Sequence, residues 1–403
     1  MRKKPLEGIR IADFGWVFTI PLTTKMLGDW GAEVIKIEGV KRGDGERRRP
    51  PYSKGVPGLD RAVDFNYNNT SRKSLSLNLQ HPKGKAVAKK VVAWADIVTE
   101  NFSGGVMERM GLGYDALCQV NPDIIMLSAS LQGQTGPHAG MPGYGHHLSA
   151  LSGFHHINGW PDRPPHHMGI YTDYIAPHFC LAALMGALDY RRRTGKGQYI
   201  DISQYEASMH FQAPLLLDHQ VNGRIARRMG NRHPDAAPHG AFRCTGEDRW
   251  CVIAVFTDEE WSGFCDVIGR PAWTADPKFA ALEGRKANED DLERLVETWT
   301  KNQAAEDVMT RMQAAGVPAG VVQTAEDLLD KDPQLKHDGF FRTVPHDEVG
   351  ELRSPGPPYT LSGAISEVGP TPLLGEHNDH VCREILGMTD EQIVEYLSEG
   401  AIE

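Results

Sequence analysis

The sequence predicts an α/β protein with a parallel sheet, because short apolar runs alternate along the chain with helix-like segments. Strands are expected at residues 9–14, 34–38, 74–79, 97–98, 124–127 and 199–203. Helices are expected at 21–28, 82–95, 106–110 and 179–190. Strands that alternate with helices form parallel sheets covered on both faces.

Two of these segments carry clear periodicity. Residues 74–79 alternate between polar and apolar with period two, as a strand does. From Pro82, apolar residues recur at helical spacing along one face of the segment up to Ala95. Residues 179–190 are apolar or small nearly all round, which predicts a fully buried helix.

The length of 403 residues favours more than one core, and the amino-acid composition of the chain changes near residue 220. Residues 224–239 are basic and then rich in His and Pro; a strand is expected at 250–256, and Thr257 with Glu260 resembles a capping box. We therefore expect a large-domain segment at 1–221, a small domain at 222–330, and a linker with further large-domain sequence at 331–403. Residues 41–60 are polar and rich in proline, and so long a loop is expected to be functional or mobile.

Composition narrows the class of protein. The net charge of −10 disfavours a nucleic-acid partner. The six cysteines form no C-x-x-C pair, which is typical of reduced thiols in the cytoplasm. We expect no signal peptide and no membrane-spanning segment, because no apolar run is long enough.

Asp173 is the sharpest candidate for catalysis, because it is followed by Pro177 and then by the predicted buried helix. An Asp at such a position is more often a helix cap. Backbone N–H groups at a helix N-terminus can, however, keep a carboxylate ionised and stabilise an oxyanion.

Six basic residues on the strand–helix connections form a second candidate group: Lys36, Lys41, Arg42, Arg72, Lys73 and Arg109. Each alone is more often a solvated surface charge. Together they could converge on phosphates, since parallel sheets bind ligands at the carboxyl ends of their strands. Three adjacent histidine pairs suggest a polar pocket or plain loops, and we expect no metal, since adjacent residues on a strand point to opposite faces.

The chain resembles the class III CoA-transferases, the superfamily of formyl-CoA transferase, carnitine CoA-transferase and α-methylacyl-CoA racemase. The resemblance begins in LEGIRIADF (residues 6–14) and LGDWGAEVIKIE (27–38). It continues in ENF (100–102), GQTGP (133–137), Asp173, RTGKGQ (193–198), GNRHP (230–234), GVPAG (316–320) and LGEH (374–377). It implies a Rossmann-like large domain built from both chain ends, a smaller α+β domain, and an interlocked dimer, either a homodimer or a heteromer with a homologous subunit.

Carried over residue by residue, the resemblance implies that Asp173 is the catalytic aspartate. The residues expected to contact CoA are Val17, Phe18, Arg42, Arg72, Lys73, Asn101, Phe102, Arg109 and Tyr144. Phe18 departs from a glutamine of formyl-CoA transferase, which puts a formate or oxalate substrate in doubt and suggests a more apolar acyl pocket. Gly39 departs from an arginine, so Lys41 or Arg42 is expected to take over its phosphate contact.

Tyr144 bears on the type of reaction. The racemases carry a histidine base at this position, and tyrosine is a poor base near neutral pH because its unperturbed pKa is about 10. The expected reaction is therefore transfer of CoA between carboxylic acids through mixed-anhydride and aspartyl-CoA thioester intermediates, with CoA as substrate and no permanently bound cofactor. Aromatic or dicarboxylic acids, as in the succinyl-CoA:benzylsuccinate type, are the suggested acceptors. An acyl-CoA racemase and a non-catalytic subunit remain as alternatives.

Overall fold

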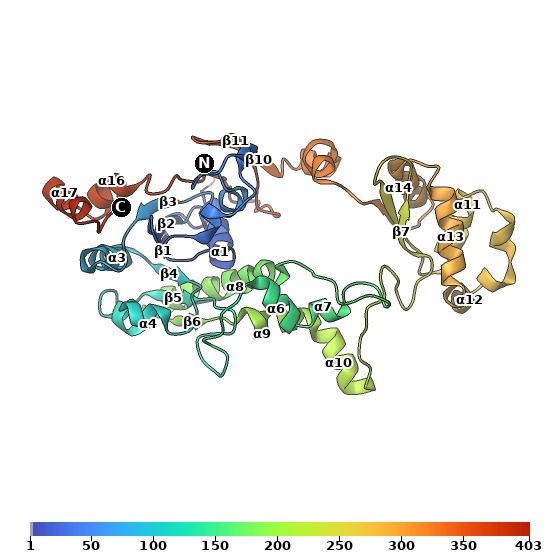
Figure 1. The fold of residues 1–403 in the computed structure, drawn as a ribbon, viewed down its shortest axis with the longest axis horizontal. Helices are drawn as coiled ribbons and strands as arrows, with labels where there is room; N and C mark the ends of the chain where they lie inside the picture. The colour runs from blue at the N-terminus through green and yellow to red at the C-terminus, as the bar shows by residue number, and fades with distance from the viewer. Residues whose placement is uncertain (1–2) are drawn as a thin grey trace. The chain divides into compact units, whose positions relative to one another are not determined.

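The computed structural model describes residues 3–403, which form two compact units (Figure 1). The large unit comprises the residues up to 155 together with 167–225 and 334–403. The small unit comprises 156–166 and 226–333. The large unit is therefore built from both ends of the chain. Residues 156–166, within the segment expected to form the large domain, belong to the small unit.

The centre of the large unit is a six-stranded parallel sheet with the order β3-β2-β1-β4-β5-β6. Its strands are β1 (Arg10–Asp13), β2 (Glu33–Glu38), β3 (Lys73–Ser76), β4 (Ile97–Glu100), β5 (Ile125–Ser128) and β6 (Tyr199–Asp201). Ile11 pairs with Val34 on one side and with Ile97 on the other. The C-terminal segment adds an isolated antiparallel bridge between Leu77 and Ile402. The expected parallel α/β architecture is confirmed.

Helices bury apolar side chains on both faces of this sheet. On one face α3 (Pro82–Trp94) contributes Val87 and Val91 to a core that also contains Ile393 of α17 (Asp390–Ser398). On the other face α1 (Thr19–Asp29) and α8 (Tyr171–Thr194) share a second core. The prediction that residues 179–190 are buried all round is wrong, because only one face of α8 packs here; Met185 is 38% exposed.

The remaining elements of the large unit are short. The α-helices and strands among them are α2 (Val63–Asn68), α4 (Val106–Met110), α5 (Tyr114–Cys118), α6 (Gly145–Leu151), α7 (Phe154–Ile157, which ends in the small unit), α9 (Gln204–Met209), α10 (Ala213–Asn222), β10 (Phe341–His346), β11 (Gly350–Pro355), α15 (Pro333–His337, which begins in the small unit) and α16 (Asn378–His380). Within residues 3–403, no helix combines the length and apolar character that a membrane crossing requires.

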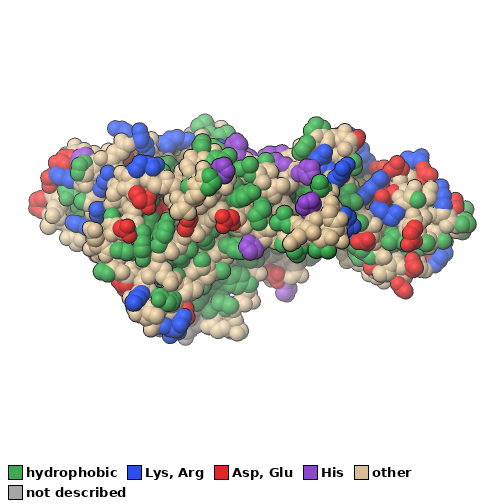
Figure 2. Space-filling view, turned by 90° about the horizontal axis from the view of Figure 1, so that it is seen from below, with side chains coloured by type: hydrophobic (Ala, Val, Ile, Leu, Met, Phe, Trp, Pro, Cys, Tyr) green, Lys and Arg blue, Asp and Glu red, His purple; other side chains and the backbone are tan. Residues whose placement is uncertain are grey.

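The small unit is an α+β domain, as expected. Its antiparallel strands are β7 (His239–Arg243), β8 (Trp250–Ala254) and β9 (Ala319–Val321), and its helices are α11 (Asp258–Val267), α12 (Leu282–Ala287), α13 (Glu289–Thr300) and α14 (Ala305–Ala314). The capping box of Thr257 and Glu260 is present at the start of α11. Acidic and basic side chains are interspersed on the face shown in Figure 2.

Candidate functional site

Asp13, the last residue of β1, fixes the turn that leads into α1. Its Oδ1 accepts hydrogen bonds from the Gly15 N–H (2.7 Å) and the Thr99 hydroxyl (3.1 Å). Its Oδ2 accepts from the Thr24 hydroxyl (2.8 Å) and from Nη1 of Arg72 (3.0 Å). The side chains of Asp13 and Arg72 are both fully buried. A buried charge requires such partners, so this network holds the turn in one conformation.

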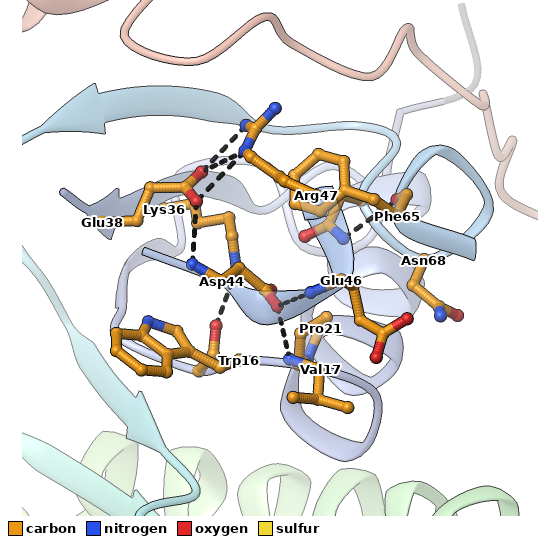
Figure 3. Close-up of polar contacts among 12 residues, drawn as sticks. Trp16, Val17, Pro21, Lys36, Glu38, Asp44, Glu46, Arg47, Phe65 and Asn68 are labelled. Carbon is orange, nitrogen blue, oxygen red and sulfur yellow. Dashed lines mark hydrogen bonds and ion pairs between the residues drawn. The ribbon is translucent and has the colours of Figure 1, made fainter. Parts of the chain in front are cut away.

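Val17 occupies the turn with a φ of +67°, a region that β-branched residues rarely adopt. Its N–H donates to Oδ1 of Asp44 (3.0 Å), and Oδ2 of Asp44 is 3.0 Å from Nζ of Lys36 (Figure 3). Lys36 also donates to the Gly15 carbonyl at 2.7 Å. The expected phosphate contact of Lys36 is therefore not available, because its ammonium is buried and neutralised inside the protein.

Asn101 joins this turn to the end of β4. Its Oδ1 accepts from the Trp16 N–H (2.9 Å), and its Nδ2 donates to the Trp16 carbonyl (2.7 Å). The rings of Trp16 and Phe102 meet edge to face with centroids 5.1 Å apart. The strand order reverses between β1 and β4, and parallel sheets bind ligands at such a point.

A cavity of about 690 Å³ opens beside this point. Its walls include the aromatic rings of Phe14, Trp16 and Phe102 and the basic side chains of Lys41, Arg42, Lys85 and Arg109. The size suits a small organic ligand, and the mixture of rings and cations suits one that carries both a heterocycle and phosphates. Of the predicted CoA contacts, Arg42, Phe102 and Arg109 lie in this cavity.

Arg72 and Lys73 do not lie in it. The Arg72 guanidinium is enclosed beneath α1, where it also donates to the carbonyls of Pro21 (2.6 Å) and Asn68 (3.1 Å). Lys73 begins β3, so it stands at the end of the strand opposite the cavity, where Nζ is 2.8 Å from Glu33. Arg72 reaches Asp13 at the carboxyl end of β1, but neither Arg72 nor Lys73 lines the cavity.

Asp173 lies in the first turn of α8 and is 6% exposed. Its Oδ1 accepts a long hydrogen bond from the Thr19 hydroxyl (3.5 Å). Its Oδ2 faces the start of α6, where a Cβ built on Gly145 would be only 2.3 Å away. Glycine at 145 therefore leaves the space that the carboxyl group occupies.

The pKa of Asp173 is raised from 3.8 to about 7, chiefly by burial; the hydrogen bond from Thr19 opposes this rise, and the negative charge of Glu46 adds to it. The carboxyl group is thus desolvated and titrates near neutral pH. A carboxylate stripped of water at a helix N-terminus is suited to nucleophilic attack on an acyl group.

Aromatic residues stand next in the chain to Asp173 and to the two residues beside its carboxyl group: they are Tyr174, Phe18 and Tyr144. Phe18, directly before α1, meets Tyr174 edge to face with centroids 5.0 Å apart. Tyr144 precedes α6 and is 51% exposed. Of the predicted CoA contacts, Val17, Phe18, Asn101 and Tyr144 are not walls of the cavity. Phe18 and Tyr144 instead adjoin Thr19 and Gly145, the residues beside the Asp173 carboxyl group, and Asn101 holds the backbone of the cavity residue Trp16.

Sequence reasoning missed four residues of this region: Thr19, Lys85, Glu46 and Arg49. Lys85 had a readable signal, because it lies in the first turn of the helix that follows β3. Glu46 is 3% exposed and accepts from Nη1 of Arg49 at 2.9 Å, and burial raises its pKa. Both belong to the loop at residues 41–60, where no periodic pattern marks individual side chains.

Comparison with known proteins shows which family and which relatives the chain is similar to. The family described as CoA-transferase family III matches residues 6–378. Succinyl-CoA–D-citramalate CoA-transferase of Chloroflexus aurantiacus is 33% identical over 397 residues, which cover 97% of this chain and 96% of the relative. The beta subunit of succinyl-CoA–L-malate CoA-transferase from the same organism is 32% identical over 99% of this chain and 98% of its own. A CaiB/BaiF family protein of Brucella suis has a similar crystal structure, with a TM-score of 0.86 and 29% identity over 96% of this chain and 100% of that one.

Proposed function

The chain belongs to CoA-transferase family III, and from that premise we propose that it moves CoA from succinyl-CoA to a dicarboxylic acid, with Asp173 as the covalent carrier. That it is a CoA-transferase follows from the family; the acids and the intermediates are our proposal. The observation that carries it is the geometry of Asp173, a buried carboxyl group at a helix start with its oxygens held between Thr19 and Gly145.

The relatives support the choice of acids. Two of them are named for succinyl-CoA as donor and for citramalate or malate, both dicarboxylic acids, as the other partner. The aromatic side chains of Phe18 and Tyr174 would also suit an acceptor that carries a ring. Benzylsuccinate is such an acceptor and is itself a dicarboxylic acid.

The proposed reaction conserves the thioester. A carboxylate oxygen of Asp173 attacks the thioester carbon, the C–S bond breaks, and a mixed anhydride and CoA thiolate result. The thiolate attacks Cγ of Asp173, succinate leaves, and an aspartyl-CoA thioester remains. The acceptor carboxylate then attacks Cγ and releases the thiolate, which finally attacks the acceptor acyl carbon and frees Asp173. No proton is consumed, and burial of Asp173 keeps water from the intermediates.

CoA is proposed to lie in the cavity beside Trp16 and Phe102. The cations of Lys41, Arg42, Lys85 and Arg109 would bind its phosphates, and the rings would pack on its heterocycle. Val17, Asn101 and Phe18 would shape the path of the thioester end towards Asp173.

The cysteines are all free, which supports a reducing, cytoplasmic compartment.

We also propose that the enzyme is a dimer, either of two identical chains or with a homologous subunit. One relative is named as the beta subunit of its enzyme. In the large unit, the region around α10 exposes large apolar side chains: Phe211, Leu216, Leu217, Val221 and Ile225. An apolar surface of this kind is typical of a contact between subunits.

The covalent carrier is tested by trapping. With succinyl-CoA and no acceptor, a proteolytic peptide that contains Asp173 should gain the mass of CoA, or of a succinyl group if the anhydride survives. Hydroxylamine should convert the thioester to a hydroxamate, and borohydride should reduce it, each with loss of activity. Mass spectrometry of the peptide reads all of these states.

Two outcomes would contradict the proposal in different ways. An unmodified peptide together with exchange of the substrate α-proton for solvent deuterium would favour a racemase. No adduct, no exchange and no turnover with a panel of acids would favour a non-catalytic subunit.

Activity should depend on the ionisation of Asp173. Since only the carboxylate attacks and its pKa is about 7, kcat/KM for succinyl-CoA should fall roughly tenfold per pH unit below that value and level off above it. Glu46→Gln removes a charge that raises this pKa, so it should move the acid limb to lower pH; Thr19→Val removes a hydrogen bond to the ionised form and should move it to higher pH. If the acid limbs of the two variants do not move in opposite directions, the group that titrates is not Asp173.

A further inference from the structure

Three consecutive arginines follow β2, and they differ in what they contact. Arg47 is buried: its guanidinium donates to Glu38 (Nη2, 2.8 Å) and to Asp60, and it lies 3.7 Å above the ring of Phe65 (Figure 3). Arg48 is exposed and donates to the Val40 carbonyl. Arg49 turns the other way, towards α6.

The Arg49 guanidinium is held at one end and open at the other. Nη1 is 2.9 Å from Oε1 of the buried Glu46, while the Arg49 side chain as a whole is 53% exposed. Its Cζ lies 5.1 Å from the centre of the Tyr144 ring, a cation–π distance. Within residues 3–403, this guanidinium has five N–H donors and forms one hydrogen bond, to Glu46.

This guanidinium is a neighbour of the Asp173 site. Tyr144 immediately precedes Gly145, the residue whose missing side chain leaves space for the Asp173 carboxyl group. The charge of Glu46, to which Arg49 is bonded, is one of the causes that raise the pKa of Asp173. Arg49 thus contacts Tyr144, and the Asp173 carboxyl group lies beside the next residue, Gly145.

A dicarboxylic acid has one carboxyl group that reacts and one that stays charged. The second charge must enter a partly desolvated site, which is costly without a cation beside it. A planar guanidinium binds a carboxylate through two parallel N–H bonds. Lys41, Arg42, Lys85 and Arg109 line the cavity proposed for CoA, and Arg47 and Arg72 are buried with partners. Arg49, which lies over the ring of Tyr144 next to Gly145, is exposed and open to a ligand.

We propose that Arg49 binds the non-reacting carboxylate of the dicarboxylic acid and so makes the enzyme selective for such acids. The proposal rests on the transfer function proposed above. In it Glu46 and Tyr144 are positioning residues, which hold the guanidinium with its free edge towards the acid.

The test compares substrates that differ only in the distal carboxylate. For Arg49→Gln, kcat/KM with succinyl-CoA should fall roughly 10- to 150-fold, the range for a hydrogen bond to a charged group. With butyryl-CoA, which has a methyl group in place of the carboxylate, it should change less than about threefold, since no ion pair of this kind forms. Arg49→Lys should retain part of the selectivity, because lysine keeps the positive charge but cannot form two parallel N–H bonds to a carboxylate. Arg48→Gln, next in the chain and bonded only to a carbonyl, is the matched control and should leave both substrates unaffected.

The outcomes separate this proposal from the function on which it rests. Equal losses with both thioesters in Arg49→Gln, or a wild-type enzyme that does not prefer succinyl-CoA, would overturn the role of Arg49 while the adduct on Asp173 still forms. Failure of wild-type enzyme to form that adduct from either thioester would overturn the transfer function itself.

Discussion

Asp173→Asn should lower the rate of CoA transfer by at least about 10⁴-fold, the scale seen when a covalent nucleophile is removed. The amide has nearly the shape of the carboxyl group, so it fits the space beside Gly145, but it cannot form the anhydride. Succinyl-CoA should still bind, because the cavity that holds the proposed CoA contacts does not include residue 173. Turnover, adduct formation and the dissociation constant of CoA measure the three effects separately.

Stability provides the control that inactivation is not unfolding. The pKa of Asp173 is raised in the folded state, from 3.8 to about 7, so the folded protein binds a proton that the unfolded chain has released. The contribution of this group to stability is fully present below pH 3.8 and is lost as pH rises through about 7. Asparagine cannot ionise, so Asp173→Asn should be at least as stable as wild type above pH 7, with a difference that narrows towards pH 4. Thermal unfolding at several pH values measures this.

Near-wild-type turnover of Asp173→Asn or Asp173→Ala would reject Asp173 as the carrier. Loss of activity together with loss of CoA binding and a lower unfolding temperature above pH 7 would instead give residue 173 a structural role.

The sequence predicted the sheet well because each strand of a parallel sheet is a short apolar run between polar turns. It placed the end of β3 less well. Residues 77–79 continue the alternating pattern, yet the ladder beyond Ser76 is completed by the C-terminus: Asn78 donates to the Ala401 carbonyl, and Leu77 bridges to Ile402. A contact across more than 300 residues leaves no local pattern, so no periodicity argument could have found it.

The resemblance, through motifs that span the chain, also singled out Asp173, Phe18 and Tyr144. The roles of individual arginines were not. Arg72 and Arg109 both lie on connections of the sheet, but one is buried against Asp13 and the other lines the cavity. The two arginines differ because Arg72 pairs with Asp13, which is 59 positions away in the chain and becomes its neighbour only after folding. Local sequence gives the residue type at such positions and leaves its partner undetermined.

Arg72→Met should destabilise the protein by about 3–5 kcal/mol, the cost of leaving one member of a buried ion pair without its partner. Burial lowers the pKa of Arg72, and the charge of Asp13 opposes that effect. Without Arg72, Asp13 would keep three neutral donors, from Gly15, Thr24 and Thr99, and no counter-charge. Urea denaturation followed by fluorescence measures the change in the free energy of unfolding.

Lys73→Met is the matched control, since it removes the cation next in the chain. The Lys73–Glu33 pair is at 2.8 Å with side chains 28% and 38% exposed, so its loss should cost less than about 1 kcal/mol. Asp13→Asn combined with Arg72→Met should recover part of the lost stability, because no uncompensated charge then remains. If Arg72→Met were as stable as Lys73→Met and instead raised KM for every acyl-CoA alike, Arg72 would be a CoA contact after all. The contrast between the two neighbouring cations thus separates a residue that holds the β1–α1 turn from one that holds the substrate.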